Sequence, residues 1–275
     1  QLVDHIQQIV ATQNVNSAGV GPGAMVTKEI WTATLPKDKF PQPLSPADRV
    51  IHQAETEKNE YQPSTQHSSD KETYQPADIS ASDAPIELIA IGSSTGGTEA
   101  LSTILTRLRP PLPGIVIVQH IPPMFSRLLS ERLDNECALT VKEAATGDIV
   151  QPDHVYIAPG SKHMTLKRYG SQLILHCNPG PPVHSVCPSV DVLFDSVAHE
   201  VGRNACGVLL TGMGKDGAEG LLHMRQQGAH TIGQDEATST VYGMPKAAFE
   251  QGAVETQLPL SAIPAAITNI ARKKP

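Results

Sequence analysis

The chain has 275 residues, of which 39% are hydrophobic and only 4% aromatic, so it can hold one large or two small domains with mostly aliphatic cores. Its formal net charge of −7 argues against nucleic acid as a partner, since that usually needs a basic face. The sequence shows neither a secretory signal nor an apolar run of about 18 residues, so we expect a cytoplasmic protein without membrane insertion.

The first 85 residues differ in composition from the rest. Residues 2–10 carry apolar side chains at helical spacing, which predicts one short helix. Gly, Pro, Ser and Gln then become frequent, and residues 55–83 contain seven acidic and two basic side chains. This part of the chain has too few apolar side chains to bury a core. We therefore predict that it is a flexible acidic linker and that residues 86–275 form a folded domain.

From residue 86 onward, apolar strands alternate with helical segments. The pattern predicts strands at 88–91, 115–118, 154–158, 207–211 and 231–233, helices at 98–105, 125–133, 190–201 and 221–227, and a hairpin joining 164–166 to 173–175. This alternation is typical of an α/β fold, and we predict a doubly wound, mostly parallel sheet with helices on both faces and a β-hairpin. Such sheets bind ligands at the carboxyl ends of their strands.

The cysteines predict neither a disulfide nor a metal site. Cys137, Cys177, Cys187 and Cys206 have no C-x-x-C spacing and no zinc-finger pattern of histidines around them. We therefore expect reduced thiols, no bound metal and no cofactor.

A Gly-rich turn joins the strand at 88–91 to the helix that follows. Gly92-Ser93-Ser94-Thr95-Gly96 fits the nucleophile-elbow pattern G-x-S-x-G. Such a turn would lift the Ser94 hydroxyl above the sheet edge and direct free N–H groups of the helix start at its target. A tight turn without chemistry, or a phosphate cradle, would use the same residue types, so both alternatives stay open.

Three polar residues follow separate predicted strands. They are Ser94, His120 and Asp216, and each stands just beyond a strand end. This set suits acyl transfer, with the serine as nucleophile, the histidine as general base and the aspartate as the carboxylate that orients the histidine. Singly, they could be a turn residue, a hydrogen-bonded histidine and a helix N-cap. Nucleotide binding is the main rival, but Ser94 replaces a glycine of G-x-G-x-x-G, and Asp216 replaces the Ser or Thr of a P-loop.

Six segments together resemble the bacterial chemotaxis protein-glutamate methylesterase/protein-glutamine glutaminase (CheB) family. They are IGSSTGGTEA at 91–100, QHIPP at 119–123, YIAPG at 156–160, PSVDVLF at 188–194, LTGMGKDG at 210–217 and GMP at 243–245. The resemblance covers about residues 86–270 in the family's order. Its serine, histidine and aspartate fall on Ser94, His120 and Asp216, an order that differs from the Ser, Asp, His order of α/β-hydrolases.

The resemblance implies a serine hydrolase that demethylates glutamate methyl esters, and deamidates glutamines, on methyl-accepting chemoreceptors. The N–H of Thr95 is a candidate oxyanion donor from its place at the helix start, and the resemblance adds the N–H of Met213. Family members also meet the chemotaxis histidine kinase through an amino-terminal receiver domain. This chain shows no complete receiver, and residues 2–10 could be its last helix. The alternative is a catalytically inactive module that docks on receptors.

One segment departs from the family pattern. Residues 183–187 read VHSVC, where the family often has a basic residue before Pro188, and this puts contacts to the substrate in doubt. We expect His163 and His184 to be ordinary core or surface histidines.

Overall fold

The computed structural model of the chain describes residues 85–272. The predicted first helix, the acidic linker and any end of a receiver domain lie outside these residues. In chain order the elements are β1 (Leu88–Ser93), α3 (Gly97–Leu105), β2 (Gly114–Gln119), α4 (Pro123–Glu136), β3 (Thr140–Glu143), β4 (His154–Ile157), β5 (His163–Tyr169), β6 (Gln172–Asn178), α5 (Val190–Glu200), β7 (Ala205–Leu209), α6 (Ala218–Gln226), β8 (His230–Gln234), α7 (Met244–Glu250), β9 (Thr256–Leu258) and α8 (Ile263–Ala271).

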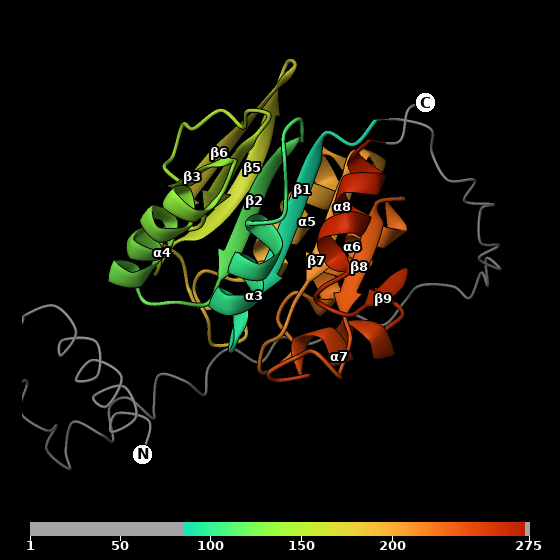
Figure 1. Ribbon diagram of the computed structural model, residues 1–275. Helices are drawn as coiled ribbons and strands as arrows, with labels where there is room; N and C mark the ends of the chain where they lie inside the picture. The colour runs from blue at the N-terminus through green and yellow to red at the C-terminus, as the bar shows by residue number, and fades with distance from the viewer. Residues whose placement is uncertain (1–84, 273–275) are drawn as a thin grey trace, which may run out of the picture. The chain divides into compact units, whose positions relative to one another are not determined.

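Seven strands form one parallel sheet in the order β3-β4-β2-β1-β7-β8-β9, and β5 and β6 form a separate antiparallel hairpin. Within the described residues, the first strand, β1, lies in the middle of the sheet; the chain then fills one half with β2, β3 and β4 and returns to fill the other half with β7, β8 and β9 (Figure 1). This reversal confirms the predicted doubly wound α/β sheet with a hairpin. It also creates a switch point between β1 and β7, where such sheets bind ligands.

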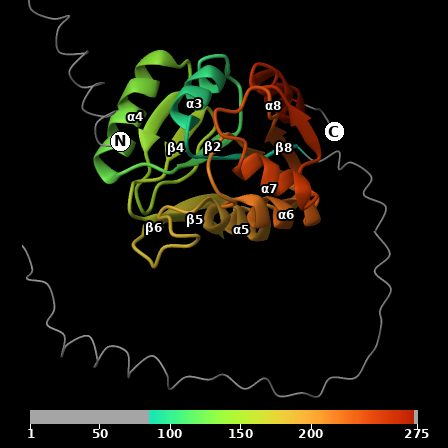
Figure 2. The ribbon, with the colours of Figure 1, turned by 90° about the horizontal axis from the view of Figure 1, so that it is seen from below.

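Helices cover both faces of the sheet because its strands are apolar on both sides. In β1, Ile89 and Ile91 pack under α3, α4 and α8, whereas Leu88 and Ala90 pack against α5, α6, α7 and the hairpin. Figure 2 shows the two layers, with α3, α4 and α8 on one side and α5, α6 and the hairpin on the other. Full burial on both faces explains the continuous apolar runs of the central strands.

Several element bounds differ from the predictions. The strand predicted at 207–211 is Ala205–Leu209, so Thr211 already belongs to the loop beyond it. The edge strands β3 and β9, and the helices α7 and α8, were not predicted. Both edge strands have only three or four residues with partly exposed side chains, so they lack an apolar run and depend on their neighbours for pairing.

None of the helices within residues 85–272 combines the length and the apolar character needed to cross a membrane.

Candidate active site

Ser94 lies in the turn between β1 and α3. Its N–H donates to the carbonyl of Thr211 (3.0 Å), and its own carbonyl accepts from the N–H of Gly97 (2.8 Å). Gly96 has φ +79°, and a Cβ there would also collide with the Thr240 side chain, so the turn needs glycine at this position. The turn places the half-buried Ser94 at the carboxyl edge of the sheet, beside the switch point.

Gln119, the last residue of β2, ties the ends of two strands together. Its buried amide donates to the carbonyls of Ser94 (2.9 Å) and His120 (3.0 Å), and its Oε1 accepts from the Ser93 hydroxyl (2.7 Å). The N–H of His120 also donates to the carbonyl of Ser93 (3.1 Å). The backbones that carry Ser94 and His120 are therefore locked side by side.

The structure brings His120 and Asp216 into direct contact. His120 Nε2 lies 2.8 Å from Asp216 Oδ2, and the two side chains are only 11% and 3% exposed. Because Asp216 accepts at Nε2, Nδ1 is the ring nitrogen left free to accept a proton. Among residues 85–272, no side chain or backbone group hydrogen-bonds the Ser94 hydroxyl, so the structure joins His120 to Asp216 but shows no bond from His120 to Ser94, which lies on the adjoining turn.

The Asp216 carboxylate accepts hydrogen bonds from the first turn of α5. Oδ1 accepts from the Ser189 hydroxyl (2.7 Å) and the N–H of Asp191 (3.2 Å), and Oδ2 accepts from the N–H of Val190 (2.7 Å). Burial by itself would raise the pKa of this carboxyl, but the hydrogen bonds from His120 and the start of α5 outweigh it and hold the pKa below the ordinary 3.8. Asp216 is thus kept as a carboxylate, and the positive end of the helix adds to that effect.

Two backbone N–H groups in the loops at Ser94 have no hydrogen-bond acceptor among residues 85–272. Within the described part of the chain, the N–H groups of Thr95 and Met213 donate to no protein acceptor. Thr95 follows Ser94 directly, and Met213 follows Gly212, where an added Cβ would lie 2.7 Å from Ser94 Cβ. Both residues are solvent-exposed, and free N–H groups of this kind can donate to a negatively charged oxygen.

The family model for CheB methylesterase matches residues 89–267, nearly all of the described sheet and its helices. The chain belongs to the CheB methylesterase family. The six segments that suggested this family in the sequence lie around the carboxyl edge of the sheet or follow its strands. Neither nucleotide binding nor an inactive docking module is favoured by this membership.

Individual CheB relatives agree with the family match. A protein-glutamate methylesterase/protein-glutamine glutaminase of Syntrophotalea carbinolica is 51% identical over 184 residues, 67% of this chain and 52% of the relative. One from Leptospira interrogans is 55% identical over 186 residues, 68% of this chain and 54% of the relative. The chain therefore spans about half the length of the curated CheB relatives it matches.

A solved CheB structure matches the fold. The crystal structure of the Thermotoga maritima CheB methylesterase catalytic domain has a TM-score of 0.66 and 38% sequence identity to this chain. The match covers 68% of this chain and 99% of that domain.

Sequence reasoning missed two residues that hold the candidate site in place. Ser189 and Gln119 lie within the quoted segments PSVDVLF and QHIPP, but no role was assigned to either. A signal existed for Ser189, because serine directly before an amphipathic helix is a typical N-cap. None existed for Gln119, whose partners Ser93 and Ser94 come from the end of the neighbouring strand β1 and its turn.

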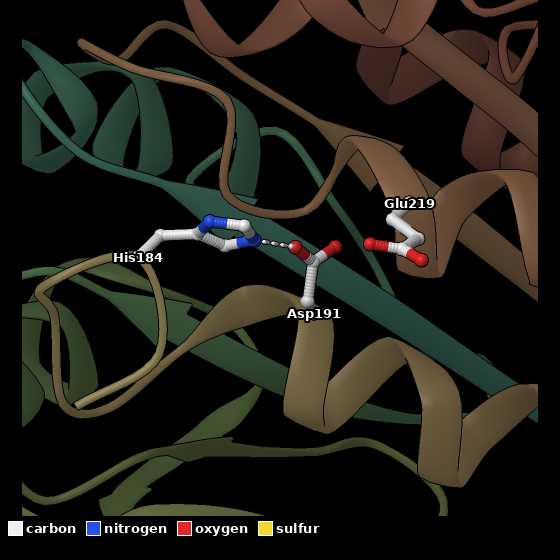
Figure 3. A group of neighbouring side chains, drawn as sticks. All are labelled: His184, Asp191 and Glu219. Carbon is white, nitrogen blue, oxygen red and sulfur yellow. Dashed lines mark hydrogen bonds and ion pairs between the residues drawn. The ribbon is translucent and has the colours of Figure 1, made fainter. Parts of the chain in front are cut away.

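A second cluster of polar side chains lies near the start of α5 (Figure 3). Ligand-type atoms of His184, Asp191 and Glu219 all lie within 4.8 Å of one another. Both oxygens of Asp191 are already used, Oδ2 by His184 Nε2 (2.9 Å) and Oδ1 by the N–H of Gly220 (2.8 Å). Lys215 lines the same cavity with a positive charge. These contacts are an imidazole–carboxylate hydrogen bond and a hydrogen bond from the backbone of α6.

The pKa of Asp191 is shifted in the opposite direction to that of Asp216. Burial raises the pKa of the Asp191 carboxyl above its ordinary value, and the negative charge of Asp216 adds to the rise. The N–H of Gly220 and the imidazole of His184 offset only part of this pKa shift.

The four cysteines are free thiols in the structure. Burial raises the pKa of Cys137 and Cys177 to about 11 and that of Cys206 to about 12, so none of these three supplies a thiolate near neutral pH. Burial also raises the pKa of Cys187.

Proposed function

We propose that this chain is a serine hydrolase that demethylates glutamate methyl esters, and deamidates glutamines, on chemoreceptors. One observation carries the proposal: His120 and Asp216 form a largely buried imidazole–carboxylate pair at the sheet edge, and hydrogen bonds from Gln119 and the His120 backbone tie it to the turn that carries the free hydroxyl of Ser94. The names of the relatives support the choice of substrate.

In the first half of the reaction, the Ser94 Oγ attacks the ester carbonyl carbon while His120 Nδ1 takes its proton. Asp216, held as a carboxylate, keeps the other ring nitrogen protonated and stabilises the imidazolium that forms. The tetrahedral intermediate collapses as the carbon–oxygen bond to the methoxy group breaks. The leaving group takes the proton back from His120 and departs as methanol.

The negative oxygen of the intermediate needs hydrogen-bond donors. The unpaired N–H groups of Thr95 and Met213 fill that role in the proposal. Loss of one such donor costs about 2.7–4 kcal/mol of transition-state stabilisation in other enzymes, so the pair contributes much of the rate.

In the second half, water attacks the acyl-enzyme and gives a proton to His120, which passes it to the departing Ser94 oxygen. The product is a glutamate side chain. A glutamine follows the same route with ammonia as the leaving group. No step draws on a metal or cofactor.

The direct test measures methanol release from a methylated chemoreceptor fragment by the parent chain and by Ser94→Ala. The matched control is Ser102→Ala on α3, whose hydroxyl binds the Glu136 carboxylate at the surface. We expect release by the parent and the control only. Receptor binding without release by any of the three would replace the proposal with the docking module.

The chemoreceptor is the proposed partner, and action on its methyl-accepting glutamates would place the chain in the cytoplasm. Contact with the chemotaxis histidine kinase would run through a receiver domain, which would lie outside residues 85–272.

A further inference from the structure

His163, the first residue of β5, is a buried histidine outside the reacting trio, with 9% of its surface exposed. The N–H of Ser189 donates to its Nδ1 (3.2 Å), and its Nε2 lies 3.0 Å from the carbonyl oxygen of Pro181. A backbone N–H can only donate and a carbonyl can only accept, so Nδ1 must be bare and Nε2 must carry hydrogen. The two contacts together assign the neutral Nε2–H form of the ring.

Ser189 connects this ring to the reacting groups. It is the N-cap of α5, and its hydroxyl donates to Asp216 Oδ1 (2.7 Å) while also accepting from the N–H of Val192 (3.4 Å). Asp216 in turn holds His120 (2.8 Å). A continuous chain of hydrogen bonds therefore runs from His163 through the backbone and side chain of Ser189 to the carboxylate that orients the general base.

The polypeptide packs closely around the His163 ring. A Cβ added at Gly180 would lie 2.9 Å from His163 Cδ2, so the loop that carries Pro181 presses against the ring. Asp216 depends on the start of α5 for three of its four hydrogen bonds, and His163 fixes the residue where that helix begins. A shift of Ser189 would move all three of these donors and the Asp216 carboxylate with them. Small displacements of catalytic groups lower the reaction rate strongly.

We propose that His163 is a positioning residue: its neutral imidazole fixes Ser189, and through it Asp216 and His120, in the geometry that activates Ser94. It touches neither substrate nor reacting atoms. The inference rests on the proposed function only in taking Ser94, His120 and Asp216 as the reacting trio.

Two conservative variants separate the two nitrogens of the ring. In His163→Asn the amide oxygen can occupy the place of Nδ1 and still accept from the N–H of Ser189. In His163→Gln the amide nitrogen can occupy the place of Nε2 and still donate to Pro181, while the bond to Ser189 is lost. His163→Ala removes both contacts. His176→Asn, on the neighbouring strand β6 of the same hairpin, is the matched control.

The experiment uses the full chain and two activity readouts. One is kcat and KM for methanol release from the methylated receptor fragment. The other is the rate at which an alkyl phosphonofluoridate modifies Ser94, followed by mass spectrometry. In that reaction the serine oxygen bonds to phosphorus, fluoride leaves and His120 takes the proton, so it reports on the trio without a receptor. Circular dichroism checks the fold of each variant.

We expect Asn and the His176 control to stay within about threefold of the parent, and Gln and Ala to lower kcat and the modification rate about tenfold with KM unchanged, as loss of one hydrogen bond predicts. The proposal is overturned if Gln and Ala, while folded, remain within twofold of the parent, or if Asn falls as far as Ala. It is also overturned if all three variants fail to fold. A parent that reacts with the phosphonofluoridate but releases no methanol would refute the proposed function alone.

Discussion

Replacing Asp216 by Asn tests the proposed mechanism most directly. The carboxylate has four donors around it, two at each oxygen, and an amide can accept at only one of the two positions. With its NH₂ group on the Oδ2 side, Asn would face the N–H of Val190 and force His120 into the wrong tautomer. With NH₂ on the Oδ1 side, it would face the N–H of Asp191, and Ser189 would have to reverse its hydroxyl.

The magnitude follows from the charge that is lost. His120 becomes positive in the transition state while 11% exposed, next to a carboxylate that is 3% exposed. Two unit charges about 4 Å apart interact by about 4 kcal/mol at an effective dielectric constant of about 20. That corresponds to about a 10³-fold loss of kcat, and the wrong tautomer would increase the loss towards the ~10⁴ seen for a comparable change in another serine triad.

The assay is the steady-state rate of methanol release with the methylated receptor fragment, together with urea unfolding to show that the variant is folded. The control is Asp195→Asn, because Asp195 forms a similar carboxylate–imidazole contact with His223 (2.7 Å) that is half exposed on the surface of α5 and α6. We expect the control to retain the parent's rate. A folded Asp216→Asn variant whose kcat falls less than tenfold would refute the proposed role of this carboxylate.

Three further outcomes are expected. Ser94→Ala should abolish methanol release with little change in Tm, because a hydroxyl without protein partners contributes little to stability; turnover by this variant would exclude Ser94 as the nucleophile. Gln119→Leu, similar in volume, should lower the free energy of unfolding in urea by about 1–3 kcal/mol, because it leaves buried polar groups around Ser94 without hydrogen-bond partners, and a loss under about 1 kcal/mol would contradict this expectation. Because the folded pKa of Asp216 lies below the ordinary 3.8, its stabilisation is complete above that pH and is lost as pH falls through the folded pKa. Acid titration of unfolding should therefore show a steeper fall for the parent than for Asp216→Asn, and equal slopes would count against the lowered pKa.

The sequence predicted the central part of the fold because that part is governed by burial on both faces. The runs at 88–91 and 115–118 are fully apolar, and the helices that follow them carry apolar side chains at helical spacing. The edge strands were not predicted because they lack this burial on both faces and so have no continuous apolar run. β9 has three mostly exposed residues and exists through its pairing with β8, a contact that no local pattern encodes.

The sequence by itself determined the residue types after each strand, the glycines that let Ser94 sit in a tight turn, and the six segments that point to one family. It placed Ser94, His120 and Asp216 at strand ends because a parallel sheet brings all its carboxyl ends to one edge. Only the tertiary structure decided that Asp216 meets His120 through Nε2, that the start of α5 holds the carboxylate, and that Gln119 and His163 brace the two sides. These contacts join residues 25 to 96 positions apart, and such pairings depend on how layers pack rather than on any local periodicity.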